Sequence, residues 1–251
     1  MLHYCEDGAG DPLVMLHGFS FDHRMWDDQV RALAPQYRVI RPDLRGFGRS
    51  PAGDEPYSHA ADVAALLDHL KVDRAILVGL SLGGGAAINF AVQHPERVRA
   101  LVVIDSSLGG FSAPEIAAAQ SRVVEVARTR GIAAARDAWL ALPLFAPALA
   151  NTSCADRVQS FIADYQGWHW LNADRGRPLA PPALQRLYTI RCPTLVMVGE
   201  LDTPEFHAIA DTLHARIPGS KRVVVAGAGH MANLEAPDAV NRSVLEFLQD
   251  V

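Results

Sequence analysis

A serine on a glycine-flanked turn is the residue of this sequence best suited to do chemistry. Ser81 lies at the centre of Gly79–Gly83, a G-x-S-x-G pattern that directly follows the apolar run Ala75–Gly79 and precedes a helical pattern. A serine on a tight turn at the carboxyl end of a strand projects its hydroxyl into the crevice above the sheet. The next helix points its N-terminus at the same place, where a negatively charged oxygen would develop. We therefore predict that Ser81 is a nucleophile for acyl transfer.

Glycine-rich turns also bind phosphate, so a nucleotide site is an alternative for this segment. The run Gly83–Gly85 invites that interpretation, but no G-x-G-x-x-G pattern follows a strand and no P-loop lysine is present. A second glycine pair, Gly46 and Gly48, lacks the third glycine of the dinucleotide pattern, which favours a structural role. A turn that only reverses the chain is the remaining alternative. We predict that no cofactor is needed.

A serine hydroxyl is a weak nucleophile until a base takes its proton. The best-placed histidine is His230, because it ends a Gly-Ala-Gly-His loop directly after the apolar run Arg222–Ala226. The carboxyl ends of parallel strands meet at one edge of a sheet, so this loop should lie near Ser81. Other histidines fall late in helical patterns, in expected surface segments or in the helical region 111–188. We predict His230 as the base; a loop histidine without a role is the alternative.

Two aspartates can fix the tautomer of His230 and stabilise its charged form. Asp202 follows the apolar run Thr194–Val198 in a Gly-Glu-Leu-Asp segment. Asp105 ends the run Ala100–Ile104 and competes for the same role. We predict Asp202 as the acid and keep Asp105 as the alternative.

Six short apolar runs, rich in Val, Ile and Leu and without clean polar alternation, are typical of strands buried on both faces of a parallel sheet. They are Pro12–Leu16, Tyr37–Arg41, Ala75–Gly79, Ala100–Ile104, Thr194–Val198 and Arg222–Ala226. Helical patterns lie between or after them, at His23–Leu33, Ala60–Leu70, Leu82–His94, Phe206–Arg216 and Ala239–Leu248. Strands alternating with helices require crossovers, so we predict an α/β fold with a doubly wound, mostly parallel sheet.

The alternation stops between Phe111 and Thr189, where the pattern is helical and rich in Ala. We predict that residues 111–188 form a helical cap inserted between the core segments 1–110 and 189–251. Its helices are expected at Pro114–Arg130, Ile132–Leu142, Asp156–Trp170 and Pro182–Leu187. Its aromatic side chains either line a pocket or bury the cap against the core; they are Trp139, Phe145, Phe161, Tyr165, Trp168 and Trp170.

Together these pieces resemble the α/β-hydrolase superfamily over nearly the whole chain, and the chain order Ser, Asp, His is the order of that family. The matching segments are Leu16–Phe19, Pro42–Ser50, Gly79–Gly83, Gly199–Asp202 and Gly227–His230. Within the superfamily the chain is most similar to small capped bacterial esterases and enol-lactonase-like proteins. The N-terminus is short, which implies that one early strand of the family is missing.

The resemblance also implies roles for backbone and side-chain groups around the nucleophile. Backbone N–H groups of Leu82, the residue after the nucleophile, and of Phe19 would form an oxyanion hole. His17 would pack beside that hole without transferring protons. Relatives that act on haloalkanes or epoxides carry a carboxylate at the position of Ser81, so the serine argues against both activities.

The implied reaction is hydrolysis of carboxylic esters through an acyl-enzyme on Ser81. Lactonase, enol-lactonase, carbon–carbon hydrolase and perhydrolase reactions use the same three residues and stay open. The Leu, Ala and aromatic content of the cap favours a small to medium, mostly apolar substrate. Two alternatives come from other classes: a small-molecule binding or sensing protein that keeps residual activity, and a lipase whose cap is an amphipathic lid.

The amino-acid composition limits the classes of partner that we expect for the protein. The chain has 251 residues, 49% hydrophobic and 20% charged, with a net charge of −5. A basic surplus is absent from the sequence, so we expect neither nucleic acid nor an anionic membrane as partner, and the composition leaves the oligomeric state open. No run reaches the roughly 18 apolar residues of a membrane span, and the N-terminus has no signal-peptide pattern. The three cysteines form no disulfide or zinc spacing, so we predict a cytoplasmic protein without a metal.

Overall fold

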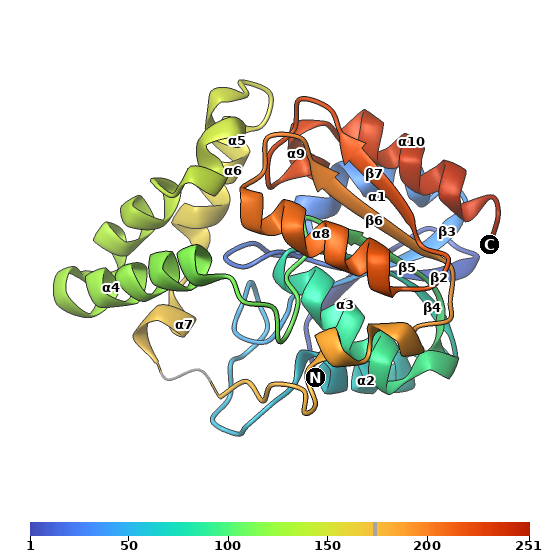
Figure 1. Ribbon diagram of the computed structural model, residues 1–251. Helices are drawn as coiled ribbons and strands as arrows, with labels where there is room; N and C mark the ends of the chain where they lie inside the picture. Colours follow the sequence, from blue (N-terminus) through green and yellow to red (C-terminus); the bar gives the residue numbers. More distant parts are fainter. Residues whose placement is uncertain (173–174) are drawn as a thin grey trace.

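The computed structural model describes residues 1–172 and 175–251 and shows a seven-stranded sheet with helices on both faces (Figure 1). The strand order is β1-β3-β2-β4-β5-β6-β7. The strands are β1 (Tyr4–Asp7), β2 (Asp11–Leu16), β3 (Tyr37–Pro42), β4 (Ala75–Leu80), β5 (Val98–Ile104), β6 (Thr194–Gly199) and β7 (Lys221–Val225). Every pairing is parallel except β1 with β3. The predicted doubly wound α/β fold is confirmed, and all six predicted strands are present.

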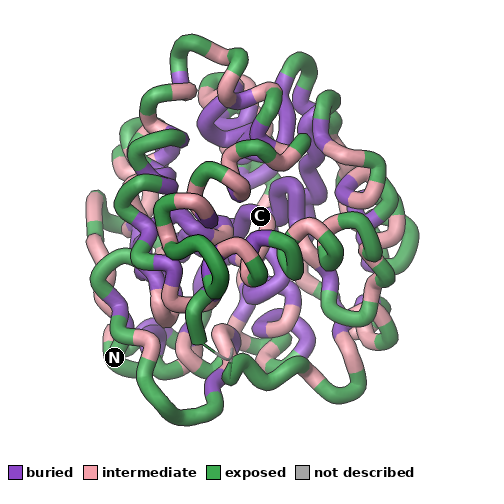
Figure 2. The backbone as a smooth tube through the Cα atoms, turned by 90° about the vertical axis from the view of Figure 1, so that its left-hand side faces the viewer, coloured by how far each residue is buried: buried purple, intermediate pink, exposed green. Residues whose placement is uncertain are grey.

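The edge strand β1 was not predicted from the sequence. Its four residues, YCED, contain no apolar run, and none of them is fully buried. Backbone pairing rather than side-chain burial holds it in place, because Tyr4 to Asp7 run antiparallel to β3 with Tyr4 opposite Pro42. The interior strands β4 and β6 are the opposite case, since every residue of both is buried. Figure 2 shows the same contrast, with buried backbone running through the middle of the molecule.

The core helices cover the two faces of the sheet. Helices α1 (Asp27–Leu33) and α10 (Pro237–Leu248) pack together on one face, and α2 (His59–His69), α3 (Leu82–Gln93) and α8 (Pro204–Arg216) cover the other (Figure 1). Helices α8 and α10 begin two residues before their predicted starts because each opens on a proline, which suits the first turn of a helix. Two short helices were not predicted, η1 (His23–Trp26) as a separate turn and α9 (Ala232–Glu235).

Between β5 and β6, the regular elements of the described residues are all helices, apart from an isolated parallel bridge of Gly176 with Tyr57. The helices are α4 (Pro114–Leu140), η3 (Pro143–Phe145), α5 (Ala146–Ala150), α6 (Ala155–Asp164), α7 (Trp168–Leu171), η4 (Ala183–Gln185) and η5 (Leu187–Thr189). The backbone of α4 breaks at Gly131, whose φ is 85°, and this agrees with the two helices predicted on either side of it. Residues 173 and 174 of the predicted cap lie outside the described part of the chain, and the cap boundaries stay a prediction.

One predicted cap helix, Asp156–Trp170, is wrong. The structure divides it into α6 and α7, and helix α6 ends before Tyr165. Gly167 has a φ of 71°, and this left-handed conformation cannot continue a right-handed helix. The predicted helix Pro182–Leu187 is likewise replaced by the two short 3₁₀ turns η4 and η5.

Polar contacts fasten this helical segment to the core beside the carboxyl ends of the strands. The carboxylate of Glu205, in α8, accepts the backbone N–H groups of Glu115 and Ile116 at the start of α4, each at 3.0 Å. The indole N–H of Trp139 donates to the Ser20 hydroxyl at 2.8 Å. No single helix of the described residues is long and apolar enough to cross a membrane; Pro114–Leu140 and Pro143–Ala150 pass that test only together, as a pair bent by 59°.

Candidate active site

The turn at Ser81 is held in strained geometry by hydrogen bonds to the end of β5 and to the loop that follows it. Ser81 has φ 52° and ψ −113°, a conformation that side-chain-bearing residues rarely adopt and that typically costs about 1–3 kcal/mol. Its backbone N–H donates to Ile104 O at 3.0 Å, and its carbonyl accepts the N–H of Ser107 at 3.0 Å. A Cβ on Gly79 would collide with the backbone of Gly83, so the glycines let the chain cross itself closely. The turn therefore presents the Ser81 hydroxyl at the carboxyl edge of β4.

The fold brings the three predicted side chains into one hydrogen-bonded chain. His230 Nε2 lies 3.0 Å from Ser81 Oγ, and His230 Nδ1 lies 2.9 Å from Asp202 Oδ2. An ionised carboxylate only accepts hydrogen bonds, so the ring proton belongs on Nδ1 and Nε2 is left as acceptor for the serine hydroxyl. His230 and Asp202 are 5% and 7% exposed, which shields the pair from water. This arrangement can remove a proton from Ser81.

The structure separates the two candidate acids. Asp202 faces His230 and also accepts the N–H of Thr203 at 2.7 Å. Asp105 is fully buried beside Asp202 and accepts the N–H of Gly199 at 2.7 Å. Burial and the neighbouring Asp202 carboxylate raise the pKa of Asp105 well above its usual range. Asp202 is therefore the carboxyl group placed against the imidazole, and Asp105 lies behind it.

Sequence reasoning missed Glu235, a buried carboxylate that holds the His230 loop. Its Oε2 accepts the N–H of Gly229 at 2.7 Å, and its Oε1 accepts the N–H of Met231 at 3.0 Å. These are the residues immediately before and after His230. Desolvation raises the pKa of Glu235, although both backbone hydrogen bonds and His230 oppose that rise. The sequence did contain a signal for this residue. It is a glutamate five residues after the histidine and directly before the Ala-Pro pair that starts a helix.

We expect Glu235→Gln to lower kcat by about 10- to 100-fold with little change in KM, because a displaced imidazole loses its alignment with Ser81. The amide keeps one acceptor oxygen but turns an NH₂ group toward a backbone N–H, so the free energy of unfolding should fall by about 1–3 kcal/mol. Steady-state kinetics and denaturant unfolding measure the two effects.

The matched control for that variant is Glu200→Gln. Glu200 accepts the N–H of Gly227 in the same loop at 2.8 Å, but its side chain is exposed to water. Its kinetics should stay near wild type. Equal losses of kcat in both variants, or a change confined to KM, would contradict a positioning role for Glu235.

The predicted oxyanion donors, Phe19 and Leu82, come from two segments next to Ser81. Leu82 is the first residue of α3, and the first N–H groups of a helix have no partner within it. Phe19 follows Gly18, where an added Cβ would lie 3.1 Å from the Leu80 side chain and 3.7 Å from Ser81 Cβ. The donor roles of both N–H groups stay a prediction.

His17 joins the Phe19 loop to the next loop of the chain. One ring nitrogen contacts Gly18 O at 2.8 Å, and Nε2 accepts the N–H of Leu44 at 2.8 Å. Complete burial lowers the pKa of His17, which keeps the ring neutral. A neutral ring with both nitrogens engaged suits the packing role that the family resemblance implied.

Ser81 lines two cavities. One, of about 40 Å³, is walled by aromatic side chains that include Trp139 and Phe145 of the helical segment. The other, of about 360 Å³, lies between Ser81 and α4. Both are lined by Gln120, a polar side chain of α4 in a mostly apolar surface. All of the six cap aromatics singled out in the sequence except Trp168 are buried, and Phe161, Tyr165 and Trp170 line neither of these two cavities.

Comparison with known proteins places the chain in a family. The family model described as the alpha/beta hydrolase fold matches residues 11–237. The pimeloyl-[acyl-carrier protein] methyl ester esterase of Aeromonas hydrophila is 32% identical over 96% of this chain and 96% of its own length.

Two solved structures have the same fold at nearly full coverage. A thermophilic esterase from Thermogutta terrifontis is 29% identical, with a TM-score of 0.85 over 99% of this chain and 93% of that one. The enol-lactonase from Burkholderia xenovorans LB400 is 29% identical, with a TM-score of 0.82 over 99% of this chain and 96% of that one. The predicted likeness to bacterial esterases and an enol-lactonase is confirmed. The chain belongs to the α/β-hydrolase family and is an enzyme of that family.

Proposed function

We propose that the protein hydrolyses carboxylic esters of small to medium, mostly apolar molecules through an acyl-enzyme on Ser81. The observation that carries this proposal is the unbroken hydrogen-bond chain from Ser81 through His230 to Asp202, at 3.0 and 2.9 Å, beside an apolar cavity. The esterase relatives reported above support the reaction class.

Each proposed step follows from the placement of these groups. His230 Nε2 takes the Ser81 proton while Oγ attacks the ester carbonyl, and Asp202 stabilises the imidazolium that forms. The carbonyl oxygen becomes an oxyanion that the N–H groups of Phe19 and Leu82 would stabilise, each worth about 3–4 kcal/mol. The imidazolium then protonates the departing alcohol. Water, deprotonated by the same nitrogen, releases the carboxylic acid and restores Ser81.

The two cavities differ in size, which supports a substrate with a small group on one side of the scissile bond and a larger group on the other. The cavity of about 40 Å³ suits a short group, and the cavity of about 360 Å³ accepts a larger one. Phe19, Ile116 and Phe206 line both, so apolar contacts supply most of the affinity. Gln120 lines both cavities and can offer a polar substrate atom a hydrogen bond from the cap side.

A lactone is the second candidate substrate class, because the chain overlays an enol-lactonase over nearly its full length. Opening a lactone uses the same steps, except that the alcohol stays attached to the acyl group. The proposal for Ser81 is therefore common to both candidates.

The test is a panel of aryl esters, lactones and a vinylogous diketone, together with labelling by a fluorophosphonate. We expect an aryl ester to give a burst of one alcohol per chain, and the fluorophosphonate to modify Ser81 in the wild-type protein. Ester turnover without a burst would argue against rate-limiting release from an acyl-enzyme, and a label on any residue other than Ser81 would overturn the assignment. Preference for the lactone would select the second candidate.

A further inference from the structure

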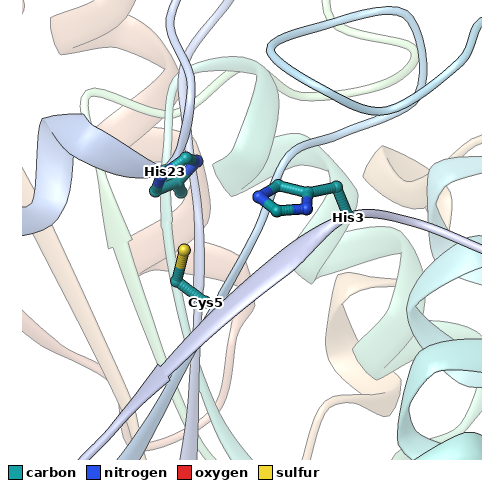
Figure 3. A group of neighbouring side chains, drawn as sticks. All are labelled: His3, Cys5 and His23. Atoms are coloured by element: carbon teal, nitrogen blue, oxygen red, sulfur yellow. The ribbon is translucent and has the colours of Figure 1, made fainter.

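Two histidines and a cysteine lie together at the sheet edge opposite the β6–β7 side. His3 precedes β1, Cys5 lies within β1, and His23 opens η1. Their ligand atoms all lie within 4.8 Å of one another. Figure 3 shows the Cys5 sulfur pointing toward the His23 ring while the His3 ring enters the same space. Strands β3 and β2 separate β1 from the Ser81 strand, so this cluster is distinct from the active site.

The spacing of His3 and Cys5 makes a chelating pair. Residues two apart on an extended chain point to the same face, so both side chains leave the edge of the sheet in one direction. Pairing of β1 with β3 fixes this direction, with Cys5 opposite Arg41. The third ligand, His23, comes from a separate segment and lies across from that pair.

A buried carboxylate already orients His23 for a metal. His23 Nδ1 lies 2.7 Å from Asp43 Oδ1, and its backbone N–H donates to the same oxygen at 2.9 Å. Because Asp43 only accepts in its ionised form, it holds the ring proton on Nδ1 and leaves the lone pair of Nε2 available. Histidines that bind metals are commonly fixed by a carboxylate in this way.

The side chain of His3 supplies an independent observation that points to a ligand. Its Nε2 is buried and has no hydrogen-bond partner among the described residues. Buried polar atoms nearly always have a partner, and an exception calls for an explanation such as an ion. The backbone N–H of His3 is bonded to Ser50 Oγ at 2.8 Å, so the position of this residue is fixed.

We propose that His3, Cys5 and His23 form a zinc site with two nitrogen ligands, one thiolate and one position open to water. Zinc binds imidazole and thiolate at about 2.0–2.3 Å, which places tetrahedral ligands about 3.3–3.8 Å apart. The present spacing needs only a small closure of the side chains. Binding releases the thiol proton of Cys5 as the sulfur–zinc bond forms. The ion ties β1 to η1, close in sequence to Phe19.

An oxygen-ligand site for Mg²⁺ or Ca²⁺ fits the residues of the same region less well than a zinc site does. Asp22 and Asp43 also lie near His23. However, Asp22 is paired with Arg24 at 2.6 Å, and Asp43 accepts the N–H of Arg49 as well as the two His23 groups. Their oxygens are therefore occupied. A thiolate and two imidazoles favour zinc over these harder cations.

The test is titration of the reduced protein with Co²⁺ followed by Zn²⁺. We expect one Co²⁺ per chain with thiolate-to-cobalt charge-transfer absorption, displacement of that ion by Zn²⁺, and a higher Tm with Zn²⁺ present. Cys5→Ser should abolish the charge-transfer band and weaken Zn²⁺ binding by at least about 10-fold. His3→Ala should weaken Zn²⁺ binding similarly.

The control variant is Cys192→Ser, which removes another partly buried thiol and should leave the cobalt spectrum unchanged. Ester hydrolysis by Cys5→Ser at the wild-type rate shows that this variant is folded. The proposal is overturned if the wild-type protein gives no thiolate–cobalt band, if the band survives Cys5→Ser, or if Co²⁺ binds without that band while blocking hydrolysis, which would place it at His230.

Discussion

Ser81→Ala should lower kcat for a short-chain aryl ester by about 10⁶-fold, because removing the nucleophile leaves only the rate enhancement given by binding and the oxyanion donors. The variant should fold normally, since alanine and serine meet the same backbone strain at φ 52°. Initial rates at saturating ester, with a fluorescent leaving group for sensitivity, measure the loss. Circular dichroism and the Tm establish that the fold is intact.

Ser107→Ala is the matched control for this variant. Ser107 also lines the larger cavity, but its hydroxyl donates to the Ser81 carbonyl at 3.1 Å and not to an imidazole. Its removal should change kcat by less than about 10-fold, the scale of one neutral hydrogen bond. If Ser81→Ala keeps a kcat comparable with that of Ser107→Ala, the acyl-enzyme mechanism is wrong, and the protein fits a binding or sensing role or another nucleophile.

The approach of Ser81 and His230 to one edge of the sheet could be predicted because each position depends on a short sequence segment. Ser81 directly follows β4 and His230 follows β7 after a short loop, and a parallel sheet brings such positions to one edge. Their roles still stay predictions that the variants above test. The fold prediction depended on the alternation of strands and helices along the sequence and required no knowledge of side-chain contacts. The structure confirms it.

Features that depend on contacts between distant residues could not be predicted. Strand β1 has no apolar pattern, and only its pairing with β3 defines it. Glu235 is a charged residue in a short helix, and its burial between two backbone N–H groups becomes visible only in three dimensions. The helix break at Gly167 was missed for a different reason, because an isolated glycine within a helical pattern can be tolerated and does not by itself mark the end of a helix.

The choice between the two aspartates was open in the sequence for a geometric reason. Both Asp105 and Asp202 follow strands that are neighbours in the sheet, β5 and β6, so both arrive at the edge where His230 lies. Side-chain direction separates them, and no pattern in the sequence encodes it. The structure turns Asp202 toward the ring and buries Asp105 behind it.

This placement predicts that Asp202→Asn will lower kcat by about 10⁴-fold. The amide matches the carboxylate in shape, but its NH₂ group cannot accept the proton on His230 Nδ1, and its oxygen gives no charge to stabilise the imidazolium. The ring then favours the tautomer that carries its proton on Nε2, which can no longer accept from Ser81. Steady-state kinetics with an aryl ester measure the loss, and KM should change little because Asp202 is shielded from the cavities by His230.

Asp105→Asn is the control that distinguishes the two acids. Asparagine keeps the shape of Asp105 and an oxygen that can accept the N–H of Gly199, and its NH₂ group can donate to the neighbouring Asp202 carboxylate. We therefore expect kcat within about 10-fold of wild type, the scale expected for one altered hydrogen bond. The reverse pattern, with Asp105→Asn inactive and Asp202→Asn active, would assign the acid to β5. Equal, large losses in both variants would instead mean that the two carboxyl groups act on His230 as a unit, since the contribution of such coupled groups is not divisible between them.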